Sequence, residues 1–355
     1  MESIDSDCLI DDIRNENDFK GVSFSKCKRG DVKSVLLLNI SKGNIESACH
    51  WCAELICAGH FMDIWEIILF YLGKKIHLGN PKLVIYLESR YGIFKTIIER
   101  RNYSSVIQLR NNPIIRKLFA EIMSLLSQSK TKHSFEAIKI NSDDDFDIAY
   151  ISEHLKAPTT QYLEPIVKEG DPKGYHIAIN EFAYSITSSD MIGACYWIEW
   201  LIEFESYCKK KKDKQLCERR TFPIEQVFQR DMIWIIWDAI LYHGKQKSNF
   251  IQRTLVSLSN LFCINYTTAC CKKRRYLLYF AVGLLIENVE TNTDLACDKK
   301  KIQSVMSQIN NVYRQIKMNE ESAKMDYLYL NAEAPSNSKE DTYRKLEIMN
   351  SYYNV

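Results

Sequence analysis

The sequence has no long apolar run, no excess of either charge and little glycine or proline. Its 355 residues include 12 glycines and 7 prolines, and 47 basic against 45 acidic side chains give a formal net charge of +2. This near-zero charge provides no overall field that attracts nucleic acid or acidic membranes, so any such binding has to be local. The longest largely apolar stretches, 232–242 and 276–286, are shorter than the about 20 residues that a membrane-spanning helix needs.

The sequence also lacks a charged-then-apolar start typical of a secretory signal, because Met1 to Asp12 is acidic and polar. Twelve cysteines are present, but they lie among apolar positions at helical spacing and form no disulfide-scaffold pattern. We therefore expect a reducing intracellular location. We expect a soluble protein that is neither secreted nor inserted in a membrane.

Strand-like alternation is scarce, so we predict an all-α fold. The clearest unit runs from Ser41 to Leu83. Asn44 precedes a stretch from Ala48 to Ile56 in which apolar side chains recur at three- and four-residue spacing. Gly59 ends this first helix, and Gly79-Asn80-Pro81 ends a second apolar run. The unit is thus a pair of helices that share one buried face.

The same unit recurs later in the chain at one constant offset. Ala48, Cys49, Trp51, Leu55 and Ile56 match Ala194, Cys195, Trp197, Leu201 and Ile202. After an insertion, the stretch from Trp65 with Gly73-Lys74 matches the stretch from Trp237 with Gly244-Lys245. We interpret this as an internal duplication that yields two related helical-bundle domains. Convergence of two amphipathic helices is the alternative.

The changes in composition along the chain predict five segments. They are an N-terminal arm (1–32), a first helical domain (33–128), a linker with short helices (129–174), a second helical domain (175–325) with a basic insertion (208–222), and a polar, tyrosine-rich C-terminal tail (326–355). The linker contains the acidic run from Asp143 to Asp147, where the helical pattern breaks.

The first unit resembles the helical C-terminal domain of clamp-loader-like AAA+ ATPases that act at stalled replication forks. The matching positions are Ser41, Gly43, Glu46, Ala48, Trp51, Ala58, Gly59, Gly79 and Pro81, with no gap. An acidic pair of the family is replaced by Lys75 and Ile76, and basic residues of its second helix become Glu66 and Ile67. In the family this domain forms the collar through which subunits assemble, so the resemblance implies an assembly role.

The ATPase half of that family is missing. A phosphate-binding loop needs an upstream glycine and a Ser or Thr after the lysine, and both Gly73-Lys74 and Gly244-Lys245 lack these features. We find no Ser/His/Asp or Cys/His arrangement with local support. We therefore predict no enzyme activity, no catalytic residue and no cofactor.

Two patterns imitate metal sites. Cys49 and Cys52 have a zinc-ligand spacing, but a helix spreads Cys49, His50, Cys52 and Cys57 around its cylinder. In the second copy Ile198 replaces Cys52. Asp143, Asp145 and Asp147 resemble the start of a calcium loop without its glycine and closing glutamate. We favour packing cysteines and a solvated linker, and predict no metal site.

The candidate contact residues are basic clusters and tail tyrosines. A polyanion contact is possible at Lys209, Lys210, Lys211, Lys212, Lys272, Lys273, Arg274 and Arg275. Solvated helix ends are the alternative. The tail tyrosines Tyr327, Tyr329, Tyr343, Tyr352 and Tyr353 are suited to anchoring a partner protein. The tryptophans lie within apolar stripes, which predicts a place in the core.

These features favour a non-enzymatic structural protein that works through contacts with capsid or assembly subunits or with copies of itself. The most concrete form is a minor capsid or internal virion protein of a large DNA virus, because the Lys-, Ile- and Asn-rich style resembles such proteins. This resemblance implies a location in a virion or the host-cell cytoplasm. The alternative is a DNA replication or repair accessory protein with a clamp-loader collar-like domain. A metal-dependent enzyme is a third hypothesis, which elemental analysis of the purified protein tests.

Overall fold

The computed structural model describes residues 6–100, 103, 105–141, 144–213, 215–290 and 294–321. Most of them are helical and none forms a strand, which confirms the all-α prediction. The α-helices are α1 (Arg29–Ser41), α2 (Ile45–Cys57), α3 (Phe61–Tyr71), α4 (Lys82–Glu99), α5 (Pro113–Gln128), α6 (Ile148–His154), α7 (His176–Thr187), α8 (Met191–Lys210), α9 (Ile233–Gly244), α10 (Asn249–Phe262), α11 (Cys271–Ile286) and α12 (Lys299–Lys317). None of these described helices is both long and apolar enough to cross a bilayer.

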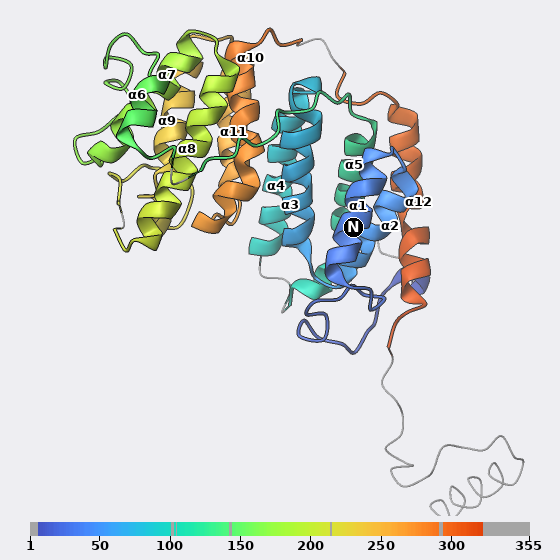
Figure 1. Cartoon of the computed structure of the whole chain (residues 1–355). Helices are drawn as coiled ribbons and strands as arrows, with labels where there is room; N and C mark the ends of the chain where they lie inside the picture. Colours follow the sequence, from blue (N-terminus) through green and yellow to red (C-terminus); the bar gives the residue numbers. More distant parts are fainter. Residues whose placement is uncertain are drawn as a thin grey trace, which may run out of the picture.

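The helices form two groups that lie side by side in Figure 1. One group holds α7 to α11, and the other holds α1 to α5 together with α12. The groups meet where α10 packs on α4 and where α11 packs on α3. Because one hydrophobic cluster extends through both groups, they share a continuous core.

Aromatic side chains fill the centre of each group. Trp65 on α3 packs against the rings of Phe94 and Phe119, at centroid distances of 5.8 Å for both. Trp234 and Trp237 on α9 pack around Phe262 in the other group. The tryptophans are therefore core residues as predicted, except that Trp51 is half-buried.

The turn before α2 has a counterpart before α8. Gly43 has φ +73° and Ser189 has φ +60°, so both turns place their corresponding residue in the left-handed region. The Asn44 N–H donates to the carbonyl of Asn39 (3.0 Å), and the Asp190 N–H donates to the carbonyl of Ser185 (2.8 Å). The two hydrogen bonds are equivalent, because the residues that form them are separated by the same offset that relates the two matching stretches of sequence.

The helices around these turns also pack in matching pairs. α1 packs on α2 as α7 packs on α8, and α2 packs on α5 as α8 packs on α11. These correspondences support the duplication, which stays a prediction. By the same correspondence, α4 of the first group matches α10 of the second group. These two helices pack on each other.

A π-helical turn at Leu72–Ile76, followed by a short 3-10 helix at His77–Gly79, brings α11 close to the first group. A Cβ on Gly73 would lie 2.9 Å from the carbonyl carbon of Tyr276, which is closer than side chains approach a backbone. Gly73 therefore allows the backbone of α11 to pack closely against the π-helical turn. His77, with φ +45°, stacks its buried ring on Phe280 with centroids 4.9 Å apart.

The linker crosses from one group to the other along the surface (Figure 1). Its first part is held by the Lys132 N–H, which donates to the carbonyl of Ile76 (3.1 Å). Its acidic part is anchored on α8, because the Tyr196 hydroxyl donates to the Asp145 carboxylate (2.7 Å) and the Trp200 indole donates to the Asp145 carbonyl (2.8 Å). Asp145 therefore fastens the linker to the second group.

The described part of the N-terminal segment is not the extended arm that the sequence predicts for 1–32. Cys8, Ile10, Phe19 and Phe24 are buried, and α1 already begins at Arg29. These apolar residues follow no helical period, which is why the sequence pattern missed them. At the other end of the fold, α12 lies within the predicted second domain (175–325) but packs on α2 and α5 of the first group.

We expect Gly43→Ala to lower the free energy of unfolding by about 1 kcal/mol, because a Cβ disfavours the left-handed conformation. Ser189→Ala is the matched control, since the equivalent turn already carries a Cβ at φ +60°. Urea denaturation measures both changes. Equal effects of the two substitutions would contradict this account of the turns.

We expect His77 to make the protein less stable in mild acid. Burial lowers the pKa of His77 from 6.5 to about 4. Between pH 6.5 and pH 4 the unfolded chain therefore binds a proton at His77 that the folded chain does not bind. The free energy of unfolding is highest above pH 6.5 and falls as the pH drops towards 4. The difference amounts to about 3 kcal/mol at the acidic end of this window.

The test compares urea unfolding of the wild type and His77→Asn from pH 7 to pH 4, since asparagine does not titrate and tolerates positive φ. The two charged groups that act most on His77, Glu287 and Lys132, are present in both proteins. The wild type should lose its advantage over the variant as the pH falls. A constant difference between the two proteins at all pH values would refute the prediction.

Candidate basic and protein-contact sites

The structure brings the two predicted basic clusters together. Lys209 to Lys212 lie at the C-terminal end of α8, and Lys272 to Arg275 lie in the first turn of α11. α8 and α11 pack on each other so that Lys272 pairs with Glu203 (2.5 Å) and Arg275 with Glu199 (2.8 Å). A cavity of about 730 Å³ opens between them, with Lys209 and Lys272 on its walls.

Three of the eight predicted basic side chains pair with carboxylates of α8. Besides the two pairs above, the Lys209 ammonium lies 3.1 Å from the Glu205 carboxylate. Burial raises the pKa of Glu205 and of Glu199, because both carboxylates are almost completely enclosed. The Tyr279 hydroxyl also donates to Glu199 (2.7 Å). These charges therefore join α8 to α11.

Arg274 is not a surface contact, which corrects its place among the polyanion candidates. Only 3% of the surface of Arg274 is exposed. The guanidinium donates to the carbonyl of Phe262 (2.6 Å) and forms an ion pair with Glu66 on α3. Arg274 thus links α11 to α10 and to the first group of helices.

Five of the candidate lysines are exposed, and one of them, Lys272, pairs with Glu203. Lys210, Lys211 and Lys212 lie at the end of α8, and Lys273 lies on the outer face of α11. The Lys211 ammonium lies 4.3 Å from the centroid of the Tyr207 ring, which fits a cation–π contact. Of the predicted set, Lys210, Lys211, Lys212 and Lys273 are the exposed side chains without an ion pair to another described residue.

A polar cluster that the sequence analysis missed lies behind the cavity. The Asp231 carboxylate accepts hydrogen bonds from the hydroxyls of Tyr266 (3.1 Å) and Thr268 (2.7 Å). The Tyr266 hydroxyl also lies 3.0 Å from the Cys271 sulfur. Burial raises the pKa of the Cys271 thiol to about 12, so this thiol stays protonated at neutral pH. The cluster fixes the loop before α11.

The cysteines with zinc-ligand spacing are packing residues in the structure. Cys49, Cys52 and Cys57 are buried on α2, and burial raises the pKa of the Cys49 thiol to about 12. No group of three or more metal-ligating side chains occurs within the described ranges. A thiol with a raised pKa is a poor nucleophile, because the thiolate is the reactive form.

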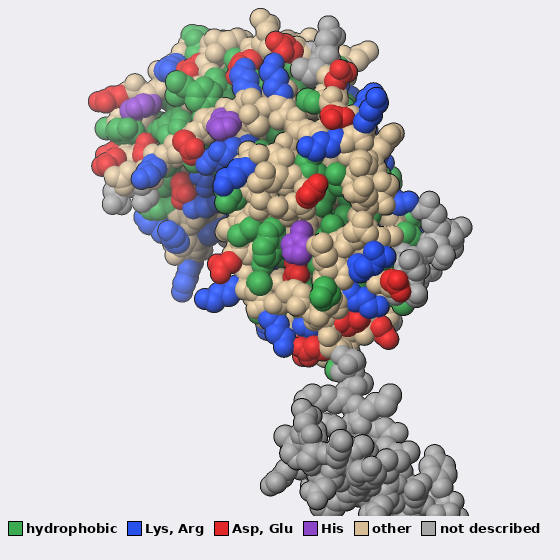
Figure 2. All heavy atoms as spheres, turned by 90° about the vertical axis from the view of Figure 1, so that its right-hand side faces the viewer, with side chains coloured by type: hydrophobic (Ala, Val, Ile, Leu, Met, Phe, Trp, Pro, Cys, Tyr) green, Lys and Arg blue, Asp and Glu red, His purple; other side chains and the backbone are tan. Residues whose placement is uncertain are grey.

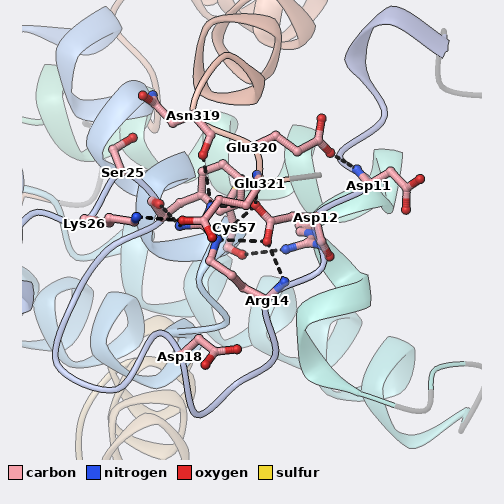
Figure 3. A network of polar contacts seen from close by, with 12 residues as sticks. Asp11, Asp12, Arg14, Asp18, Ser25, Lys26, Cys57, Asn319, Glu320 and Glu321 are labelled. Atoms are coloured by element: carbon pink, nitrogen blue, oxygen red, sulfur yellow. Dashed lines mark hydrogen bonds and ion pairs between the residues drawn. The ribbon is translucent and has the colours of Figure 1, made fainter. Parts of the chain in front are cut away.

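A second polar network joins the two ends of the described chain (Figure 3). The Glu321 N–H donates to the Asp12 carboxylate (2.9 Å), and the Ile13 N–H donates to the carbonyl of Glu321 (3.2 Å). Arg14 donates to the Asp12 carboxylate (2.5 Å) and to the carbonyl of Asn319 (3.1 Å). Burial acts to raise the pKa of Asp12, but hydrogen bonds from Arg14 and Glu321 outweigh it and lower the pKa.

Buried Arg116 extends this network into the core. Its guanidinium donates to the carbonyls of Cys8 (2.9 Å) and Arg110 (2.7 Å) and lies 3.8 Å from the centroid of the Tyr313 ring. Arg116 therefore fastens the N-terminal segment and α12 to α5. The predicted anchoring tyrosines, Tyr327, Tyr329, Tyr343, Tyr352 and Tyr353, lie outside the described residues.

No protein-family model, curated protein or solved structure matches this chain.

Arg274 and its neighbour Lys273 differ in burial, because Arg274 is buried and Lys273 is exposed. We expect Arg274→Ala to lower the free energy of unfolding by about 3 kcal/mol, because the change leaves the Phe262 carbonyl and Glu66 without their partner. Lys273→Ala is the matched control and should change stability by less than about 0.5 kcal/mol, since this side chain is exposed. Thermal and urea denaturation measure both, and equal effects would contradict the assignment.

Proposed function

We propose that the chain is a non-enzymatic assembly protein that works through contacts with other proteins. Its most concrete form is a minor capsid or internal virion protein of a large DNA virus. In this proposal the helical groups form a rigid body, and the tail from residue 326 onward holds partner subunits. The resemblance of the first helical unit to a clamp-loader collar fits an assembly role.

The observation that carries this proposal is that half of the predicted basic set is paired within the molecule, three cations by α8 and Arg274 by Glu66. The ammonium groups of Lys209 and Lys272 and the guanidinium of Arg275 each lie beside a carboxylate of α8. A site for a polyanion instead leaves its cations free to neutralise phosphates. The buried thiols with raised pKa values support the non-enzymatic part, since they too serve packing.

A second candidate function is a DNA replication or repair accessory protein. The exposed side chains of Lys210, Lys211, Lys212 and Lys273 favour it, because they lie at the adjoining ends of α8 and α11 and remain available to phosphates. This candidate requires DNA affinity that falls steeply with salt. The assembly proposal requires only weak binding without sequence preference.

The first experiment is quantitative mass spectrometry of purified virions beside replication complexes from infected cells. The assembly proposal expects the protein in virions at a stoichiometric level and not enriched in replication complexes. Enrichment only in replication complexes would overturn it in favour of the second candidate.

The second experiment measures DNA affinity of the full chain against salt. Lys210→Glu combined with Lys273→Glu is compared with Lys42→Glu combined with Lys300→Glu, which changes two exposed lysines elsewhere. The assembly proposal expects both variants to behave alike. A selective loss for the first variant, with a salt slope reduced by about 2, would support the DNA-binding candidate.

A further inference from the structure

An open groove of about 510 Å³ lies between α2 and α12, on the side of the molecule that faces the viewer in Figure 2. Its walls combine half-buried apolar side chains, Val305 and Val312 of α12, with His50 of α2. Lys301 lies at one end of the groove. The groove thus offers an apolar floor beside a positive charge.

The charge around this groove favours an acidic occupant. α12 carries five basic side chains and no acidic one, since its sequence is KKKIQSVMSQINNVYRQIK. Lys299, Lys300 and Lys301 are exposed at its start. Glu46 on α2 is the acidic residue among the groove's described walls. An aromatic segment flanked by carboxylates complements this surface.

The chain itself supplies such a segment close by. Residues 326–333, DYLYLNAE, contain Tyr327 and Tyr329 between Asp326 and Glu333. The network around Asp12 fixes Glu321, the last described residue, at the far end of α12. From Gln308 in the groove to its end at Lys317, α12 is about 14 Å long, and Glu321 lies four residues further along the chain. The six residues from Glu321 to Tyr327 span about 20 Å when extended, which is enough to run back along this part of the helix.

We propose that residues 326–333 turn back along α12 and place their tyrosines in the α2/α12 groove of the same chain. A short connection gives the tail an effective concentration in the millimolar range at its own groove. A neighbouring subunit at micromolar concentration is therefore a weaker competitor. Docked in this way, the tail tyrosines are covered until a partner displaces them.

The test uses a fluorescent peptide of residues 322–340 and two full-length proteins, the wild type and Tyr327→Ser combined with Tyr329→Ser. The variant leaves the groove empty, so it should bind the peptide. The wild type should bind it about 100-fold more weakly, because its own tail competes. Equal binding by both proteins, or no binding by either, would overturn the proposal.

Groove substitutions in the double-tyrosine variant locate the binding. Val312→Glu on α12 and His50→Ala on α2 should each weaken peptide binding, the former by about tenfold. Gln303→Glu is the matched control, because this exposed residue lies on α12 outside the groove. Unchanged binding in both groove variants would refute the location. Neither result depends on whether the protein occurs in virions.

Discussion

The structure depends on placing charged side chains of α11 inside an apolar interior without leaving them unpaired. A buried charge is costly unless a partner and hydrogen bonds compensate it. Arg274 meets this constraint with the Phe262 carbonyl and Glu66, and Arg275 meets it with Glu199. These partners belong to α10, α3 and α8. The two arginines of α11 therefore find all their partners only when both helical groups have folded and packed together.

The helices themselves could be predicted from local sequence. Asn112 before Pro113 is a helix-start signal, and in the structure the Asn112 side chain accepts from the Ile114 N–H (2.8 Å). The turn before α2 was also readable, because Gly43 suits its positive φ. The buried N-terminal segment was not, since Phe19 and Phe24 follow no period and pack irregularly on each other and on Arg14.

The candidate site was only half predictable. Lys273 and Arg274 look alike in the sequence, but neighbouring residues on a helix point in different directions. Which direction is buried depends on α3 and α10, and local spacing carries no information about them. The carboxylates of α8 did leave a signal, because Glu199 and Glu205 interrupt a largely apolar helix. A carboxylate within an apolar helix indicates a buried ion pair when another helix of the chain begins with basic residues.

The network between Asp12 and Glu321 sets the order in which the chain can finish folding during synthesis. The segment around Asp12 leaves the ribosome early, but its hydrogen-bond partners are made more than three hundred residues later. Until then the apolar surfaces of α2 and α5 on which α12 packs stay uncovered. The nascent protein therefore exposes apolar surface for most of its translation, and chaperones have that whole interval in which to bind it.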